Sequence, residues 1–294
     1  MNCCVVSAPA KINLYLDVVS RREDGYHEIL SIMQAVSLCD EVVVEISDDN
    51  GIKLLCDEDS LPTDRANIAY RAAELFMKHA GIERGIKIHL HKAIPAAAGL
   101  AGGSADAAAV LRGLNKLFKY PFSVDMLCNM ASSLGADVPF CVRGGCMCAE
   151  GIGEKLTALP CMPDCHIVIA CPDARVSTPA AYSELDRIYD NFEKGHFDKS
   201  DYFIAEAALS QKSLDRRCKK MYNIFEQVHK DRQDIHELKA IMTNSGALNA
   251  MVSGSGPSVF GIFEHADSAL LAATRIEALG YTAYTCHPID QLHM

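Results

Sequence analysis

The sequence has no tryptophan, no long apolar run and no surplus of basic residues. None of its hydrophobic stretches approaches the ~20 residues that a membrane-spanning helix needs. The 294 residues carry 28 Lys and Arg against 38 Asp and Glu, a formal net charge of −10. Because nucleic acids and anionic membranes attract cationic surfaces, we expect neither as a partner. The start, "MNCCVVSAPAKINLYLD", lacks the features of a signal peptide, so we expect a cytoplasmic protein.

Two familiar nucleotide-binding signatures are also missing. A P-loop closes with Gly-Lys-Ser/Thr, and the chain contains no Gly-Lys pair. The dinucleotide fingerprint G-x-G-x-x-G does not fit the spacing of Gly99, Gly102 and Gly103. A phosphate-binding loop of either common family is therefore excluded.

The thirteen cysteines do not form a disulfide or zinc pattern. Most of them, such as Cys4, Cys141 and Cys171, lie in apolar, strand-like runs, where a free thiol behaves as a small hydrophobe. The close pairs in "CMC" and "CMPDC" have no second C-x-x-C or H-x3-H partner. We expect reduced thiols in the core.

Strand and helix patterns alternate along the whole chain. Ile12, Leu14, Leu16 and Val18 alternate with polar residues, which predicts a strand with one buried face. Helices are predicted over 67–80, 104–118, 123–134 and 266–279, and strands over 85–94, 166–171 and 282–287. Asp137 then lies in a short loop that Val138-Pro139 should keep out of helix. The pattern indicates an α+β or α/β protein, and the length and the prolines of "ALPCMPDC" predict two domains, 1–158 and 159–294.

A glycine-rich stretch, "PAAAGLAGGSADAAAVLRGLNKLF", follows the strand at 85–94. Such a loop before a helix can hold phosphate through backbone N–H groups, and it can equally be a tight packing turn. Ser104 is the expected N-cap, with Asp106 in the first turn. A second loop, Ser253-Gly254-Ser255-Gly256-Pro257, joins two apolar strands as a flexible connection or as a lid.

Several polar residues have two possible interpretations. Lys11 and Asn13 share one face of a strand and either are solvated or face a ligand. Asp137 either caps its loop or holds a carboxylate for proton transfer. Tyr26-His27 is a surface turn or a platform for a planar base.

Three motifs together carry a family resemblance. "PAAAGLAGGSADAAA" resembles the ATP-binding motif of the GHMP kinase superfamily, and "APAKINLYLDV" and "SGSGPSVFGIF" resemble its first and third motifs, in the expected order. Within that superfamily, "APAKINLYLDVVSRREDGYHEI", "GADVPFCVRGG" and "STPAAY" together resemble the kinases that act on 4-diphosphocytidyl-2-C-methyl-D-erythritol.

The resemblance implies a reaction and a fold. ATP, accompanied by Mg²⁺, would phosphorylate the 2-hydroxyl, a tertiary alcohol, of a cytidine diphosphate conjugate of methylerythritol in the non-mevalonate isoprenoid route. The fold would be a ribosomal-protein-like N-terminal domain packed on a ferredoxin-like C-terminal domain, with the active site in the cleft between them. A monomer or weak homodimer is expected.

The resemblance also implies a role for each matching position. Lys11 and Asp137 would be the catalytic pair. The substrate would contact Asn13, Tyr26, His27, Thr178, Tyr182, Gly254 and Ser255, with Tyr26 and Tyr182 on opposite faces of the cytosine and His27 hydrogen bonded to it. ATP would contact Asn67, Ile68, Pro95, Ala96, Ala97, Ala98, Gly99, Leu100, Ala101, Gly102, Gly103 and Ser104. No metal ligand is assigned.

Ala101 and Ala105 depart from the common Gly-Leu-Gly-Gly-Gly-Ser-Ser spelling of the motif. A methyl group at Ala101 restricts positive φ, so a slightly altered loop path with intact chemistry is expected. Two other functions stay open. One is a superfamily kinase acting on mevalonate or homoserine, and the other is a non-catalytic nucleotide-sensing module.

Overall fold

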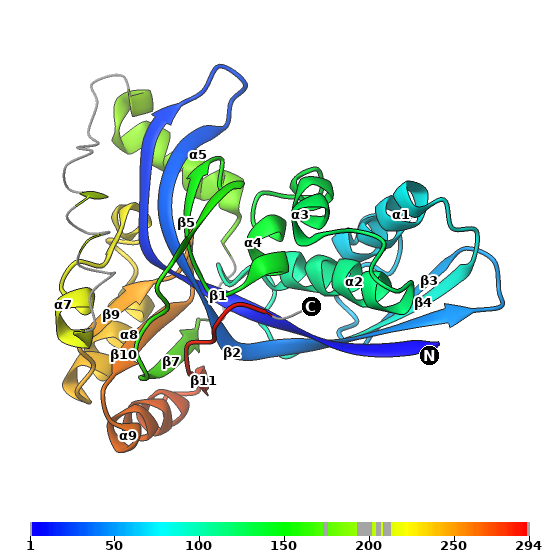
Figure 1. Ribbon diagram of the computed structural model, residues 1–294. Helices are drawn as coiled ribbons and strands as arrows, with labels where there is room; N and C mark the ends of the chain where they lie inside the picture. The colour runs from blue at the N-terminus through cyan, green and yellow to red at the C-terminus, as the bar shows by residue number, and fades with distance from the viewer. Residues whose placement is uncertain (1, 173–175, 193–201, 204–206, 208–212, 293–294) are drawn as a thin grey trace.

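Two β-sheets and the helices packed on them make up the computed structural model, which describes residues 2–172, 176–192, 202–203, 207 and 213–292. The larger sheet runs β3-β4-β2-β1-β8, with β5 paired to β2 and β6 paired to β5. These strands are β1 (Cys3–Arg21), β2 (His27–Ser47), β3 (Ile52–Cys56), β4 (Gly85–His91), β5 (Cys146–Gly151), β6 (Lys155–Leu159) and β8 (Tyr222–Asn223). The long antiparallel hairpin β1–β2 extends from one end of the molecule to the other (Figure 1).

Strand β1 is buried on both faces in its middle part, whereas the alternation of residues predicted one buried face only. Lys11, Asn13 and Asp17 are buried together with the apolar residues between them. Helix α2 packs against one side of the strand, and segments of the C-terminal half contact it as well. Shifts in the β1–β2 register, after Pro9, Asn13 and Val18, interrupt the strict alternation of faces.

Helices α1 (Ile68–Ala80), α2 (Gly102–Leu117), α3 (Val124–Ser132) and α4 (Val138–Arg143) belong with the larger sheet. The predicted ends of α1 are confirmed: the Asn67 side chain accepts a bond from the Ala69 N–H, and Gly81 ends the helix at φ 62°.

Two predictions about helix starts are wrong. Helix α2 begins at Gly102 with Ala101 as N-cap, so Ser104 lies inside the first turn and Asp106 one turn further on. Helix α4 begins directly after Asp137 despite Val138-Pro139, because a proline in the first turn gives up an N–H that has no helical partner.

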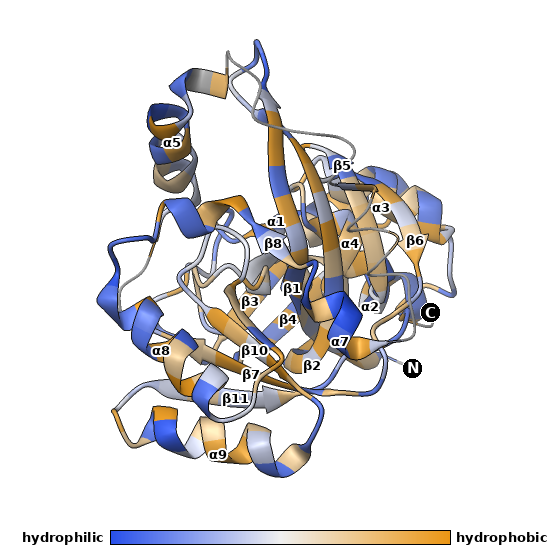
Figure 2. Ribbon diagram, turned by 90° about the vertical axis from the view of Figure 1, so that its left-hand side faces the viewer, coloured by the Kyte–Doolittle hydropathy of each residue, from blue (hydrophilic) through white to orange (hydrophobic). Residues whose placement is uncertain are grey.

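The smaller sheet has the order β11-β7-β10-β9, with β7 (His166–Cys171), β9 (Asn249–Val252), β10 (Val259–Phe263) and β11 (Thr282–Cys286). Strands β7 and β10 are mostly apolar and buried because both faces of the sheet are covered there, whereas the edge strand β11 keeps Thr282 and Thr285 exposed (Figure 2). Val168 and Ala170 pack with α8 (Gln233–Asn244) and α9 (Ala266–Glu277), while the alternate residues Ile167 and Ile169 join the core of the larger sheet.

The remaining described elements connect the two sheets. They are α5 (Thr178–Ile188), α7 (Leu214–Cys218) and the 3₁₀ turns η1 (Asp190–Phe192) and η2 (Ile224–Gln227). Strand β8, from the C-terminal half, pairs in parallel with β1 of the larger sheet. We retain 158/159 as the proposed domain boundary, between β6 and β7.

Helix α2 packs tightly on the hairpin at Gly113, where an added Cβ would lie 3.0 Å from Val44 Cγ2 and 3.2 Å from Val6 Cγ2. We therefore expect Gly113→Val to lower the free energy of unfolding by about 1–3 kcal/mol. Urea denaturation measures this loss. Lys116→Val, on the exposed side of the same helix, is the matched control, and an equal loss in both variants would contradict the packing argument.

Candidate active site

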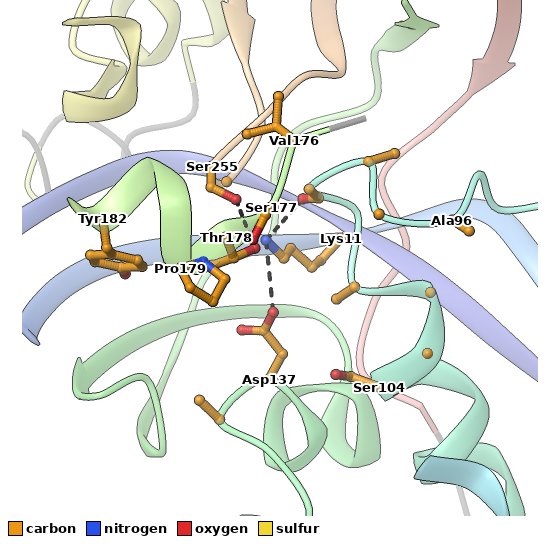
Figure 3. Close-up of a pocket in the computed structure, with 18 of the residues that line it drawn as sticks. Lys11, Ala96, Ser104, Asp137, Val176, Ser177, Thr178, Pro179, Tyr182 and Ser255 are labelled. Carbon is orange, nitrogen blue, oxygen red and sulfur yellow. Dashed lines mark hydrogen bonds and ion pairs between the residues drawn. The ribbon is translucent and has the colours of Figure 1, made fainter. Parts of the chain in front are cut away.

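One cavity of about 1010 Å³ brings together almost all the predicted site residues. Its lining comes from β1, from the loop before α2, from the start of α4 and from α5 (Figure 3). Of the predicted residues only Leu100 does not line it, because its side chain is buried in the core. The predicted residues that line the cavity are Lys11, Asn13, Tyr26, His27, Asn67, Ile68, Pro95, Ala96, Ala97, Ala98, Gly99, Ala101, Gly102, Gly103, Ser104, Asp137, Thr178, Tyr182, Gly254 and Ser255.

The glycine-rich loop turns through three residues with positive φ: Ala97 at 55°, Gly99 at 79° and Ala101 at 59°. At Gly99 a Cβ would lie 2.2 Å from the backbone oxygen of Ser253, so only glycine fits. Ala101 takes up the left-handed conformation in spite of its methyl group. The alanine therefore adds strain to the loop while keeping its turn.

The start of α2 opens into the cavity at Ala101, Gly102, Gly103 and Ser104. The first helical bond runs from the Ala105 N–H to the Ala101 oxygen, at 2.9 Å. The preceding N–H groups of the helix lack an intrahelical acceptor and lie at the positive end of the helix dipole. This arrangement favours a bound phosphate group, and it does so without a lysine in the loop.

The second glycine loop is a buried support, so the interpretation as a lid is wrong. Ser253 Oγ donates to the Gly99 oxygen at 3.1 Å, and the Ser258 N–H donates to the Ala98 oxygen at 3.3 Å. Asn223, on β8, fixes this loop in turn, because its Nδ2 donates to the Gly254 oxygen at 2.9 Å. Residues 253–257 thus support, from the C-terminal side, the glycine-rich loop at 95–104, which we call the phosphate loop after its proposed ligand.

Lys11 is almost completely buried, with 4% of its surface exposed, which overturns the interpretation as a solvated lysine. Its Nζ donates to Asn13 Oδ1 at 2.7 Å and to the Gly99 oxygen at 3.0 Å, and lies 4.0 Å from Asp137 Oδ2. Asn13 is itself fixed, because its Nδ2 donates to Ser31 Oγ at 2.9 Å. The ammonium group is held between the phosphate loop and the carboxylate (Figure 3).

Asp137 occupies the N-cap position of α4 without capping it, since its side chain makes no bond to the helix. The interpretation as a loop-capping residue is therefore wrong. With 37% of its side chain exposed, the carboxylate points into the cavity toward Lys11 (Figure 3). A carboxylate held in this way can accept a proton from a bound ligand.

The other end of the cavity is aromatic. Tyr26 is 61% exposed, whereas His27 is buried and stacks on Tyr182 with ring centres 4.7 Å apart. His27 Nε2 lies 2.7 Å from Asp186 Oδ1, and Asp186 also lines the cavity. Sequence reasoning missed Asp186; its position four residues after Tyr182, on the same face of α5, is the signal that could have revealed it.

Comparisons with known proteins agree with this geometry. The family models for the GHMP kinases N terminal domain and the GHMP kinases C terminal match residues 67–145 and 205–282. The chain is 44% identical to a 4-diphosphocytidyl-2-C-methyl-D-erythritol kinase of Caldicellulosiruptor saccharolyticus, over 93% of this chain and 92% of that one. It is 45% identical to the enzyme of that name from Acetivibrio thermocellus, over 92% and 94% of the two chains.

A crystal structure of 4-(cytidine 5'-diphospho)-2C-methyl-D-erythritol kinase superposes with a TM-score of 0.78 at 34% identity, covering 97% of this chain and 99% of that one. The chain belongs to the 4-diphosphocytidyl-2-C-methyl-D-erythritol kinase family of GHMP kinases. The mevalonate kinase of Methanococcus jannaschii, with a TM-score of 0.77 at 14% identity over 98% of each chain, shares the fold. The predicted family, the two-part GHMP fold and ATP-dependent kinase activity are confirmed.

Beneath the phosphate loop of this kinase lies a buried charged cluster, formed by Lys92, Asp40 and Asp106, that sequence reasoning also missed. Lys92 Nζ bonds to a carboxylate oxygen of both aspartates. Asp40 further accepts from the N–H groups of Ala93 and Ile94, at 2.6 and 2.8 Å, and so fixes the entry to the loop. Asp106 Oδ1 is buried without a partner in the described structure, and burial raises the pKa of its carboxyl to about 7.

The positive φ of Ala101 leads to a stability prediction. A left-handed conformation costs an alanine about 1–2 kcal/mol, so Ala101→Gly should raise the free energy of unfolding by about 0.5–1 kcal/mol after the entropy of the unfolded glycine is counted. Ala108→Gly, inside α2, is the control and should lower it by about 1 kcal/mol or more. Urea denaturation measures both changes, and a loss in Ala101→Gly would contradict the prediction.

The raised pKa of Asp106 makes stability depend on pH. Between its ordinary pKa and about 7 the folded protein holds a proton on this carboxyl that the unfolded chain releases, so stability falls as pH rises through this window. Asp106→Asn removes the effect. Between pH 5 and pH 8 the free energy of unfolding of the variant, measured by urea denaturation, should therefore rise by at least about 1 kcal/mol relative to that of the unaltered protein. The exposed control Asp125→Asn should show no such gain. If the difference in free energy of unfolding between Asp106→Asn and the unaltered protein stays constant with pH, the prediction is refuted.

Proposed function

We propose that this kinase transfers the γ-phosphoryl group of ATP to the 2-hydroxyl of 4-diphosphocytidyl-2-C-methyl-D-erythritol, a step of the non-mevalonate isoprenoid route. The observation that carries the proposal is the position of Lys11 and Asp137 beside the phosphate loop, in a cavity whose other end is aromatic. A triphosphate, a hydroxyl and a planar base would each find matching chemistry in that one cavity.

Asp137 accepts the proton in this mechanism. A tertiary alcohol is a hindered, weak nucleophile, so its oxygen attacks the γ-phosphorus as its proton passes to the carboxylate. The bond between the γ-phosphorus and the bridging oxygen breaks, and ADP leaves. Most of the rate then comes from positioning and from charge stabilisation around the transferred group.

Lys11 links the carboxylate to the phosphate loop. Its ammonium group bonds to the Gly99 oxygen and lies within ion-pair distance of Asp137, so it offsets negative charge on the alkoxide and the phosphoryl oxygens. Burial and the bond to Asn13 restrict its motion. Asn13 lines the cavity and is bonded to Lys11, so we assign it to the neighbourhood of the acceptor sugar alcohol.

The nucleotide would lie with its triphosphate on residues 95–104 and its adenine near Asn67 and Ile68. Mg²⁺ would arrive with the nucleotide and would supply positive charge that offsets the charge of the triphosphate. At this loop Ser104 offers a hydroxyl oxygen, whereas Asp106 is bonded to the Lys92 ammonium group, so we assign no protein ligand to the metal.

The cytidine would lie at the aromatic end. Tyr26 offers an exposed ring on which a base can stack, a contact worth roughly 1–3 kcal/mol per base that needs no positive charge. One face of the Tyr182 ring is already covered, because it stacks on the His27 ring. The hydroxyl groups of Thr178 and Ser255 lie 3.0 Å apart and both residues line the cavity, so we assign them to the diphosphate of the substrate.

The other functions lack a comparable observation. Mevalonate and homoserine carry no base, and the aromatic end would then have no ligand. A nucleotide sensor would have no use for a lysine and a carboxylate held 4.0 Å apart beside the phosphate loop. We further propose a cytoplasmic monomer or weak homodimer.

Replacing the proposed base tests the mechanism. Asp137→Asn should lower kcat by about 10²–10⁴-fold because the hydroxyl proton loses its acceptor. The Kd values for ATP and the cytidine substrate should stay within about threefold, since the amide keeps the size of the carboxylate. ADP release coupled to NADH oxidation measures turnover, and calorimetry measures binding.

Asp267→Asn, at an exposed aspartate on α9, is the control and should leave turnover unchanged. Near-normal turnover in Asp137→Asn would rule out the role as base. The same assay with mevalonate, homoserine and galactose tests the substrate: activity on these equal to that on the cytidine conjugate would overturn the proposed function.

A further inference from the structure

The ring of His27 is held by Asp186, a residue with no assigned role in the proposed reaction. Nε2 of His27 lies 2.7 Å from Asp186 Oδ1, and Asp186 also lies 3.6 Å from Arg21 Nε. The helix α5 and the tip of the β1–β2 hairpin meet here, side by side (Figures 1 and 2). One oxygen of the Asp186 carboxylate thus pairs with Arg21, and the other bonds to His27.

A carboxylate can only accept hydrogen bonds, so its contact with Nε2 requires a proton on Nε2. In the neutral ring the other nitrogen, Nδ1, then has no proton and becomes an acceptor. Nδ1 makes no hydrogen bond within the described part of the chain and is not fully buried there. Because His27 lines the cavity, we take Nδ1 as the ring nitrogen that a ligand can reach. Asp186 thus determines which kind of hydrogen bond His27 offers.

The ring is also fixed in orientation. Tyr182 stacks on one face at a centroid distance of 4.7 Å, and Phe192 meets the ring edge-on at 5.8 Å. Only 7% of His27 is exposed. A ring held in this way cannot easily flip to present Nε2 instead, so the acceptor keeps its direction.

An acceptor at this position distinguishes two pyrimidines of the same shape. Cytosine carries an exocyclic amine that donates a hydrogen bond, whereas uracil carries a carbonyl oxygen at the same place. The cytosine amine can donate a hydrogen bond to Nδ1. The uracil carbonyl oxygen cannot, because it and Nδ1 are both acceptors and their lone pairs would face each other. Leaving buried polar groups unpaired costs about 1–3 kcal/mol, or roughly 5- to 150-fold in affinity.

We infer that Asp186 is a positioning residue that makes this enzyme select a cytidine conjugate over the corresponding uridine conjugate, by fixing the proton of His27 on Nε2. The inference rests on the proposed function, since it requires a base at the aromatic end. Without Asp186 the imidazole is free to carry its proton on Nδ1, where it donates to the uracil carbonyl.

Asp186→Ala tests the inference with two substrates, the cytidine and the uridine diphosphate conjugates of methylerythritol. The unaltered enzyme should prefer the cytidine conjugate by about 100-fold in kcat/KM, and the variant by less than about 10-fold. The change should appear in KM, with kcat for the cytidine conjugate within about threefold. Glu184→Ala, on the exposed side of α5, is the control and should keep the full preference.

The outcomes separate the two claims. An unaltered enzyme that phosphorylates neither conjugate refutes the proposed function. One that uses the cytidine conjugate, while Asp186→Ala keeps the 100-fold preference or loses activity equally on both substrates, refutes the role of Asp186.

Nitrogen-15 NMR of the unaltered protein provides a readout that needs no variant at Asp186. The His27 signals, assigned by their absence in His27→Gln, should show a proton on Nε2 and none on Nδ1 near neutral pH. A proton on Nδ1 of the neutral ring would overturn the inference.

Discussion

The site depends on one backbone atom, the carbonyl oxygen of Gly99. It accepts hydrogen bonds from Lys11 Nζ at 3.0 Å and from Ser253 Oγ at 3.1 Å, and so joins the first strand, the phosphate loop and the C-terminal glycine loop. The approach is possible because Gly99 has no side chain and takes a positive φ. A Cβ there would separate the two loops, and the lysine would lose its place between phosphate and carboxylate.

Charge is arranged locally in this acidic protein. With a net charge of −10, the surface as a whole offers no attraction for a triphosphate. In the proposed site the triphosphate instead meets the N-terminal end of α2 and the buried ammonium group of Lys11. Lys92 lies behind the loop with two carboxylates, so it reinforces the fold there and leaves the ligand to the helix and to Lys11.

The sequence predicts well those features that depend on interactions between residues close together in the chain. The cap at Asn67, the glycine end of α1 and the strands of the C-terminal half follow from patterns within a few residues. The burial of Lys11 depends on segments far away in the chain, so its alternation with Ile12 left a solvated and a ligand-facing lysine both open. Ser104 failed as N-cap because the neighbouring loop holds Ala101 in the cap position. The contacts of Lys92 and Asp186 need partners 52 and 159 residues away, which no local pattern encodes.

Neither half of the chain contains the site by itself. The N-terminal half contributes Lys11 on β1, His27 on β2 and Asp137 at the start of α4, while Tyr182, Asp186 and Ser255 come from the C-terminal half. Strand β8 and helix α5 of the C-terminal half lie against the β1–β2 hairpin that carries both Lys11 and His27. One continuous strand, β1, holds Lys11, the proposed catalytic lysine, and leads directly to the proposed base-binding turn at Tyr26 and His27. In the proposed mechanism this strand therefore sets the distance between the reacting hydroxyl and the base.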